Sequence, residues 1–312
     1  MLPIFESILP IFLLIVVGNL LSRVPKLDRP IWEGMEVFSY WVLYPTLLFT
    51  TILHADLSGL TLDSVLGALF LAVAVMGALA LALWPLLRAT GFANGPEYTS
   101  IFQTTMRWNG FIALAVAQKL YPPEASAVVA LAMAAIIIPL NLSSVAVLVR
   151  LGTGEPNWQR TMRAMATNPL IISVLLAILL RFLPGGLYGP VGEAVRLVGS
   201  AAIGMGLLAI GAGLRPADAL RPRLIMWLPL ALKLLVFPAL LVGLAWLFGV
   251  RGDELVYLAL CGSVPTAMNG YILARQLGGD AEFYAAEATL QTAFAFLTMP
   301  LVLSLAAQLA SG

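Results

Sequence analysis

Apolar runs long enough to cross a bilayer, separated by short stretches of proline, glycine and charge, occupy most of this chain. A helix needs about 20 mainly apolar residues to cross the hydrocarbon layer. Ten such runs lie at residues 2–21, 32–53, 62–87, 98–120, 125–149, 167–183, 190–214, 224–249, 255–276 and 283–309. With 61% hydrophobic and 11% charged residues, the chain is too apolar for a water-soluble core of this length. We therefore expect an all-α, multi-pass membrane protein with ten transmembrane helices in the lipid bilayer.

Composition also excludes several classes of function. The net charge of +1 argues against a nucleic-acid partner, which requires a clustered basic surface. The single Cys261 and the single His54 exclude a disulfide framework and leave no nucleophilic pair and little for a zinc site. The Gly278-Gly279-Asp280 run superficially resembles an aspartyl protease motif, but a matched second intramembrane aspartate is missing. We expect no enzyme, no cofactor and no metal.

Basic residues predict the orientation of the helices, because Lys and Arg concentrate in short cytoplasmic loops. The N-terminus lacks the basic region and cleavage site of a signal peptide, so we expect it to be retained as the first helix. Loops after odd-numbered helices carry Arg23, Lys26, Arg29, Arg88, Arg150, Arg160, Arg163, Arg215, Arg221, Arg223 and Arg275, whereas the other side carries Lys119, Arg181 and Arg251. This bias predicts a plasma-membrane protein with both termini extracytoplasmic.

The two halves of the sequence align weakly at an offset of about 160 residues. The aligned positions are Pro10 and Pro25 with Pro169 and Pro184, Glu33 with Glu193, Leu47-Leu48 with Leu207-Leu208, Asn109-Gly110 with Asn269-Gly270, and Pro139-Leu140 with Pro300-Leu301. These matches predict one five-helix repeat at 1–150 and a second at 151–312. An odd number of helices in each repeat means that the second is inverted relative to the first.

The repeated Asn-Gly pairs predict breaks in the fourth and ninth helices. Tyr98 to Trp108 extends roughly 16 Å, about half of a hydrocarbon layer of about 30 Å, so Asn109 lies near mid-depth. In the ninth helix Pro265 removes a backbone donor, which favours a break between Pro265 and Gly270. Unwound backbone in a bilayer is tolerated where protein or water satisfies its polar groups.

Two half-helices that begin near the membrane centre aim free N–H groups and positive dipole ends at a common point, which favours an anion. The predicted substrate-binding residues are Arg107, Asn109, Gly110, Thr105, Pro265, Thr266, Asn269 and Gly270, with Thr104 as a further hydroxyl. The alternative is that the asparagines only join helices and the glycines only permit close packing. Arg107 could also form a structural ion pair or extend its side chain to the membrane–water interface.

Around these residues the chain resembles the auxin efflux carrier family, in its bacterial organic-acid carrier branch within the bile-acid and auxin transporter-like superfamily. The resemblance covers nearly the whole chain and rests on the ten-helix layout and the break at Asn109. It also rests on YPTLLFTTI at 44–52 and SVPTAMNGYILARQLGGDAEF at 263–283. Two positions depart from the family pattern, because Trp108 and Gly270 stand where the plant carriers have prolines.

The resemblance implies a secondary transporter of a small carboxylate such as malate or malonate. It implies that helices 4 and 9 cross between a scaffold domain of helices 1, 2, 6 and 7 and a transport domain of helices 3–5 and 8–10. An elevator movement of the transport domain would then carry the substrate. The alternative is a sodium-coupled symporter or a cation/proton antiporter of similar fold.

Further polar residues within or beside the predicted spans have open roles. Lys233 lies deep in the eighth helix, where it could extend to the interface or sense substrate or a coupling ion. Glu287 and Gln291 share one helix face that could serve a proton or cation. Asn141, Ser143 and Ser144 could donate oxygens to sodium or bond the backbone, and Glu193 with Arg196 is expected to form an i, i+3 pair. A coupling ion, if the protein uses one, would be a proton or sodium. A homodimer is a further possible assembly.

Overall fold

The computed structural model describes residues 2–57, 60–153, 159, 163, 166–182 and 187–311, and these are helical with short connections and no β-strand. The first half contains α1 (Leu2–Leu21), α2 (Arg29–Phe38), the π-helical η1 (Ser39–Leu43), α3 (Tyr44–His54), α4 (Leu62–Ala89), α5 (Gly95–Met106), α6 (Gly110–Leu120) and α7 (Pro123–Leu151). Arg160, Pro184 and the end of the run predicted at 167–183 lie outside the described residues.

The second half begins with α9 (Pro169–Arg181), α10 (Gly189–Ser200), α11 (Ala202–Gly213) and α12 (Pro216–Ala219). It continues with η2 (Leu224–Met226), α13 (Trp227–Ala231), the π-helical η3 (Leu232–Val236), α14 (Phe237–Leu247), α15 (Asp253–Ser263), α16 (Gly270–Leu277) and α17 (Ala281–Ser311).

Seven helical stretches in the described chain are long and apolar enough to cross a membrane. They lie at Leu2–Leu21, Arg29–His54, Leu62–Ala89, Pro123–Leu151, Gly189–Gly213, Leu224–Leu247 and Ala281–Ser311, and each coincides with a predicted run. The other three runs contain shorter helices, namely α9 and the pairs α5–α6 and α15–α16. The chain is thus a helical, multi-pass membrane protein.

Two of the long helical stretches contain a π-helical segment, and each segment ends two residues before a proline. Pro45 follows η1, and Pro238 follows η3. A proline cannot donate to the carbonyl one turn earlier, and its ring presses against that turn. The wider π-turn is one way for a helix to accommodate this strain and continue.

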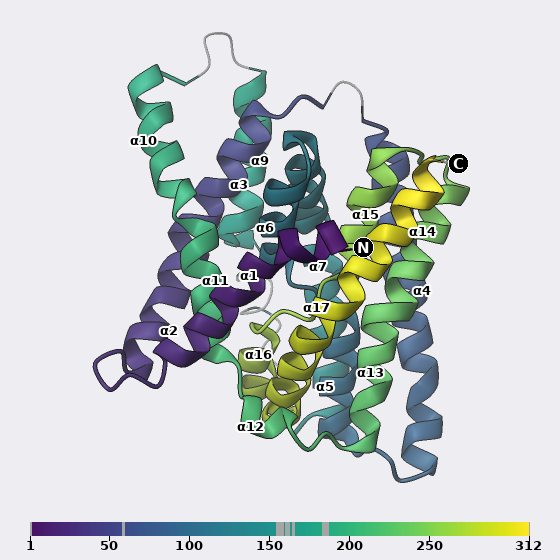
Figure 1. Cartoon of the computed structure of the whole chain (residues 1–312). Coiled ribbons are helices and arrows are strands. Elements are labelled where there is room, and N and C mark those ends of the chain that lie inside the picture. The colour runs from purple at the N-terminus through teal and green to yellow at the C-terminus, as the bar shows by residue number, and fades with distance from the viewer. Residues whose placement is uncertain are drawn as a thin grey trace.

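Two sets of helices lie on opposite sides of the molecule, with α6 and α7 between them (Figure 1). On one side α3 packs against α9 and α10, and on the other α14 packs against α4 and α15. The helices α1 and α17 run obliquely across the face shown in Figure 1 and contact each other.

Small residues bring α1 and α11 into close contact. A Cβ at Gly18 would overlap with the carbonyl oxygen of Leu208, and a Cβ at Gly211 would overlap with that of Ile15. Such close backbone approach is a common way for membrane helices to gain van der Waals contact where no hydrophobic force drives them together.

The predicted pair on α10 is confirmed, since Arg196 Nε lies 2.9 Å from Glu193 Oε2. Both side chains are exposed, so the pair adds little stability.

Candidate functional site

The two Asn-Gly positions coincide with interruptions in helical backbone, and the interruptions touch. After α5 ends at Met106, Arg107 has extended backbone, and α6 begins at Gly110. After α15 ends at Ser263, Val264 is likewise extended, and α16 begins at Gly270. The backbone N–H of Asn109 donates to the carbonyl of Pro265 at 2.7 Å, so residues 156 positions apart (265 − 109) join the two segments.

The asparagines of the two Asn-Gly pairs have different partners. Asn109 Oδ1 accepts from the backbone N–H of Ile112 at 3.2 Å and so caps the start of α6. Asn269 stands before α16 without such a cap, and its Oδ1 instead accepts from Arg107 Nε at 3.3 Å. One asparagine thus shapes the backbone, whereas the other holds the arginine.

Arg107 is a buried cation whose hydrogen-bond partners are all neutral. Only 8% of the surface of Arg107 is exposed. Besides Asn269, it donates through Nη2 to Asn141 Oδ1 at 3.0 Å and through Nη1 to Ser144 Oγ at a long 3.5 Å. Among the described residues, no carboxylate forms an ion pair with Arg107. A buried charge without a counter-ion is costly, so this position favours a visiting anion.

A cavity of about 70 Å³ lies beside Arg107. A water molecule needs about 10–15 Å³ of such space, whereas drug-sized ligands occupy roughly 300 Å³ or more. The cavity in this conformation therefore suits a ligand of few atoms. Its lining comes from both interruptions and from α7 and α9: Arg107, Trp108, Gly110, Phe111, Met133, Ile137, Leu140, Asn141, Leu170, Ala267 and Asn269.

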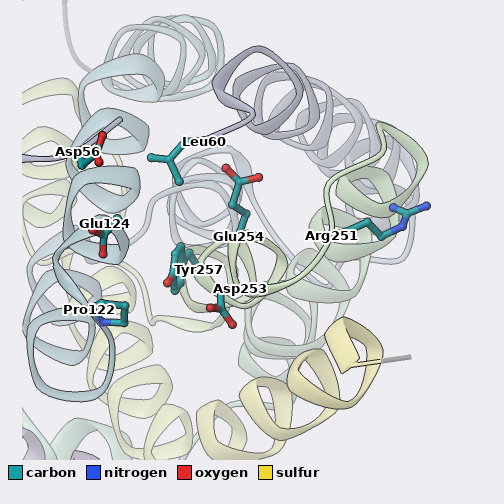
Figure 2. Close-up of a pocket in the computed structure, with 8 residues that line it drawn as sticks. All are labelled: Asp56, Leu60, Pro122, Glu124, Arg251, Asp253, Glu254 and Tyr257. Atoms are coloured by element: carbon teal, nitrogen blue, oxygen red, sulfur yellow. The ribbon is translucent and has the colours of Figure 1, made fainter. Parts of the chain in front are cut away.

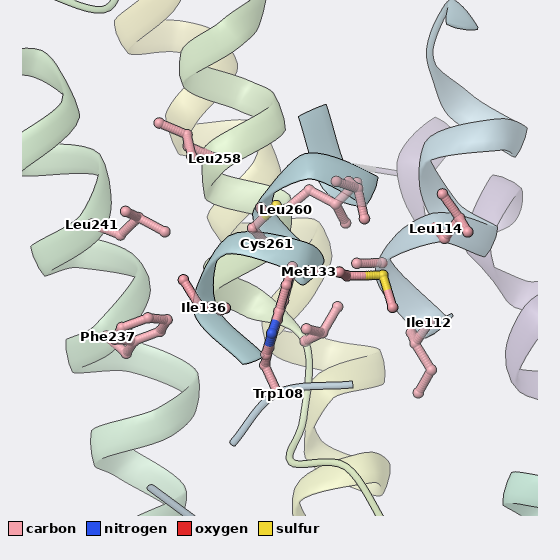
Figure 3. Packing of buried hydrophobic residues seen from close by; sticks show 14 of the residues in the cluster. Trp108, Ile112, Leu114, Met133, Ile136, Phe237, Leu241, Leu258, Leu260 and Cys261 are labelled. Carbon is pink, nitrogen blue, oxygen red and sulfur yellow. The ribbon is translucent and has the colours of Figure 1, made fainter. Parts of the chain in front are cut away.

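Met133 closes one side of this cavity. Its side chain extends from α7 toward Ile112 and Leu114 of α6 (Figure 3). Its outer atoms also lie within 2.8 Å of where a Cβ at Gly110 would be, so a larger residue there would displace the Met133 side chain. The absence of a side chain at Gly110 therefore leaves room for the Met133 side chain beside the start of α6.

The predicted site residues divide into two groups around the interruptions. Arg107, Gly110 and Asn269 line the cavity, while Asn109 and Pro265 join the two backbones beside it.

The remaining predicted residues lie elsewhere. Thr266 and Gly270 face α17, where Thr266 Oγ1 lies 3.1 Å from Tyr284 Oη and a Cβ at Gly270 would overlap with the Tyr284 ring. Thr104 Oγ1 donates to the Ser100 carbonyl of its own helix at 2.8 Å, and the buried Thr105 hydroxyl has no hydrogen-bond partner in the described part of the chain.

In this structure the polar side chains after Pro139 form hydrogen bonds with other protein groups rather than a sodium site. Asn141 and Ser144 accept from Arg107, and the Ser143 hydroxyl donates to the carbonyl of Leu140. Their sequence offered a signal, since amides and hydroxyls in an apolar helix need partners, but it did not identify Arg107 as that partner.

Lys233 does not extend to the interface, so that expectation is wrong. Its side chain is 0% exposed, and Nζ donates to the carbonyl of Gly262 at 3.3 Å. Nζ also lies 4.3 Å from the ring centre of Phe237. The helix η3 faces α15 rather than lipid at this position, so the lysine binds the end of α15 instead.

A larger hollow of about 410 Å³ lies away from both interruptions. Figure 2 shows Asp56 and Glu124 facing Glu254 and Tyr257 across it, while Arg251 points away. Glu254 is already held by the Thr61 backbone and hydroxyl. This mainly acidic lining would repel an anion, so the smaller cavity beside Arg107 is the better candidate for an anion site.

Comparison with known proteins indicates membrane transport. A family model described as membrane transport protein matches residues 158–303. A protein of Methanothermobacter thermautotrophicus described as an uncharacterized transporter is 24% identical over 306 residues, which cover 95% of this chain and 96% of that protein. Over residues 158–303 the chain thus matches the membrane transport protein family, as its resemblance to the auxin efflux carriers predicts, and it is a membrane transporter rather than an enzyme.

Proposed function

We propose that the protein is a secondary transporter of a small organic anion, a mono- or dicarboxylate, which binds beside Arg107. The observation that carries this proposal is the guanidinium itself, which is buried and hydrogen-bonded only to neutral groups among the described residues. A carboxylate can accept two parallel N–H donors from a guanidinium and would supply the missing charge. A cationic substrate would be repelled at the same point.

The helix ends around the cavity support an anion as well. Both α6 and α16 begin at the interruptions, and Gly110 and Asn269 at their starts line the cavity. The first N–H groups of a helix lack intrahelical acceptors, and the dipole places partial positive charge there. Two helix starts and one guanidinium therefore all contribute positive potential at the cavity.

The proposed architecture is ten membrane spans in two inverted repeats of five, with the interrupted fourth and ninth spans crossing near mid-membrane. In it α5–α6 and α15–α16 form the interrupted spans. The contact between Asn109 and Pro265 supports the crossing, because it joins the two interruptions directly. Substrate sites of inverted-repeat transporters commonly lie where broken helices meet.

An elevator movement is the proposed mechanism. The scaffold would consist of the spans formed by α1, by α2, η1 and α3, by α9, and by α10 and α11. The packing of α1 on α11 and of α3 on α9 supports this grouping. The remaining spans would carry the anion, supported by the packing of α15 on α14 and α17. The protein would reside in the cell membrane with both termini extracytoplasmic.

The test is ligand-dependent thermal stabilisation of the purified protein by acetate, malonate, succinate and malate at constant ionic strength. We expect at least one acid to stabilise the parent. Arg107→Gln should weaken that affinity by roughly 10- to 100-fold, because a charged hydrogen bond contributes about 1.5–3 kcal/mol.

Arg196→Gln is the matched control, since Arg196 is an exposed arginine on α10 that is paired with Glu193. Its affinity for the acid should equal that of the parent. The proposal is wrong if no acid stabilises the parent, or if Arg107→Gln binds the acid as tightly as Arg196→Gln does.

A further inference from the structure

A further buried ionisable group lies beside the interruptions, on α17. Glu287 is 0% exposed. Its Oε1 accepts from Gln291 Nε2 at 2.8 Å, while Oε2 is buried and has no hydrogen-bond partner among the described residues. An ionised carboxylate in such a place would leave one oxygen without solvation, which costs several kcal/mol.

The amide of Gln291 connects Glu287 to both interruptions. Its Nε2 also donates to the carbonyl of Thr104 at 3.2 Å, and this carbonyl belongs to the last turn of α5. Its Oε1 accepts from the backbone N–H of Thr266, between α15 and α16, at 3.0 Å. One side chain therefore links the carboxyl group to the end of α5 and to the segment that precedes α16.

The surroundings of Glu287 offer it no positive partner. The elements α5 and η3 pack against α17, but the cation that follows α5 and the cation of η3 have other partners. Arg107 donates toward Asn269 and Asn141, and Lys233 donates to Gly262.

The other titratable groups nearby are also engaged elsewhere. Among the described contacts, the buried Cys261 of α15 has no hydrogen bond to Glu287, and Tyr284 of α17 donates its hydroxyl to the carbonyl of Ala267. On α16, Tyr271 contacts Arg215, while α13 carries no titratable side chain. Among the described residues none of these groups forms an ion pair with Glu287.

The helix end that the Gln291 amide contacts on α5 adds negative potential. The Thr104 carbonyl lies at the C-terminal end of α5, where the helix dipole places partial negative charge. Burial and the negative end of α5 would both disfavour an ionised Glu287. The position therefore favours a carboxyl group whose charge is neutralised by a bound cation.

We propose that Glu287 is the site of a coupling proton, which neutralises its carboxyl group and is carried together with the anion bound at Arg107. This inference rests on the proposed anion transport. A proton fits better than sodium, because sodium needs several oxygen ligands. The contacts of Glu287 supply one amide N–H and no oxygen cage, and no metal-binding group of three acidic, His or Cys residues occurs in the described chain.

Coupling follows from charge. With Glu287 neutral, the Gln291 amide can keep its bonds to Thr104 and Thr266, and the region around Arg107 stays positive for the anion. Loss of the proton to water on the far side of the membrane would add a negative charge close to both interruptions. The anion and the proton would therefore bind and leave together, which makes the protein a proton–anion symporter.

The first experiment needs no substrate. Thermal stability of the purified parent is measured between about pH 5 and pH 9, beside Glu287→Gln and the exposed control Glu282→Gln. A carboxyl group protonated in the folded protein but ionised when unfolded lowers stability as the pH rises above its unfolded value of about 4.3. Glu287→Gln should remove that part of the decline, whereas a decline identical to that of the parent would overturn the proton site.

The second experiment uses proteoliposomes and labelled malonate, or whichever acid of the panel stabilises the parent. An inward gradient of one pH unit should drive up to about tenfold accumulation in the parent and in Glu282→Gln. Glu287→Gln should keep the exchange of internal for external acid but lose this accumulation. A purely structural role of Glu287 would affect both.

Accumulation by Glu287→Gln equal to that of the parent, or accumulation driven by a sodium gradient at constant pH, would refute the coupling. If the parent exchanges none of the acids, the anion transport itself is refuted. The substrate-free titration then still decides whether Glu287 holds a proton.

Discussion

Arg107 Nε lies 3.3 Å from Asn269 Oδ1, so the cation that follows α5 is held by the residue that precedes α16. This bond and the backbone bond from Asn109 to Pro265 join two segments that are far apart in the sequence. A change at either interruption should therefore reach the other, and we expect mutations there to affect ligand affinity and stability together.

The cap of α6 gives a first prediction. Asn109→Ala should lower the free energy of unfolding by about 1 kcal/mol, because the N–H of Ile112 loses its acceptor, and Asn109→Ser should restore part of that loss. Asn109→Ala should also weaken carboxylate affinity, since the cap fixes the backbone next to Arg107. Asn94→Ala removes the cap of α5 at its other end and should lower stability alone. Thermal unfolding with and without ligand measures both effects, and unchanged affinity in Asn109→Ala would contradict the prediction.

The contact between α1 and α11 gives a second prediction. Gly211→Ala should destabilise the protein by about 1–3 kcal/mol, because the new Cβ would overlap with the Ile15 carbonyl and force the helices apart. Gly204→Ala lies in the same helix with no atom within 4 Å of the new Cβ and should cause no loss. The midpoint of thermal unfolding in detergent compares the two variants. Equal midpoints would show that the close approach of α1 and α11 is not needed for stability.

Met133 gives a third prediction, about the size of the ligand. Met133→Ala should enlarge the cavity beside Arg107 and shift preference from malonate toward the longer glutarate, measured as the ratio of their apparent affinities. Ile136→Ala is the control, since Ile136 is buried on the same helix but does not line the cavity. Both variants should lose roughly 2–5 kcal/mol of stability. An identical shift in both would mean that general loosening, not the cavity, changes the preference.

Lys233 gives a fourth prediction, about stability. Lys233→Met should leave the thermal midpoint unchanged or raise it, because one hydrogen bond to the Gly262 carbonyl offsets little of the cost of burying an ammonium group. Lys119→Met, an exposed lysine at the end of α6, provides the comparison. A clear loss of stability in Lys233→Met alone would show that the ammonium group holds the end of α15 in place.

Much of the helical layout could be predicted from the sequence because it depends on local properties. Hydropathy over about 20 residues locates a span whatever its neighbours are, and seven predicted runs coincide with long helices. The interruptions could also be predicted from the sequence, since Asn109-Gly110 and Pro265 disfavour continued helix through their own backbone chemistry. The contact between Glu193 and Arg196 is local as well, because helical geometry places residues three apart on one face.

The partners of the buried polar groups were decided by tertiary packing. Asn109 and Asn269 each begin an Asn-Gly pair, yet one caps a helix and the other accepts from Arg107. Extension to the membrane interface was one of the roles considered for Lys233, but its helix turns it toward α15. Sequence alone thus determined where the apolar helices lie and where two of them are interrupted, because hydropathy and backbone propensity act within a few residues. Only the folded chain decided that Arg107 is surrounded by neutral oxygens and that Gln291 joins Glu287 to both interruptions, because hydrogen bonds between distant residues depend on how whole helices pack.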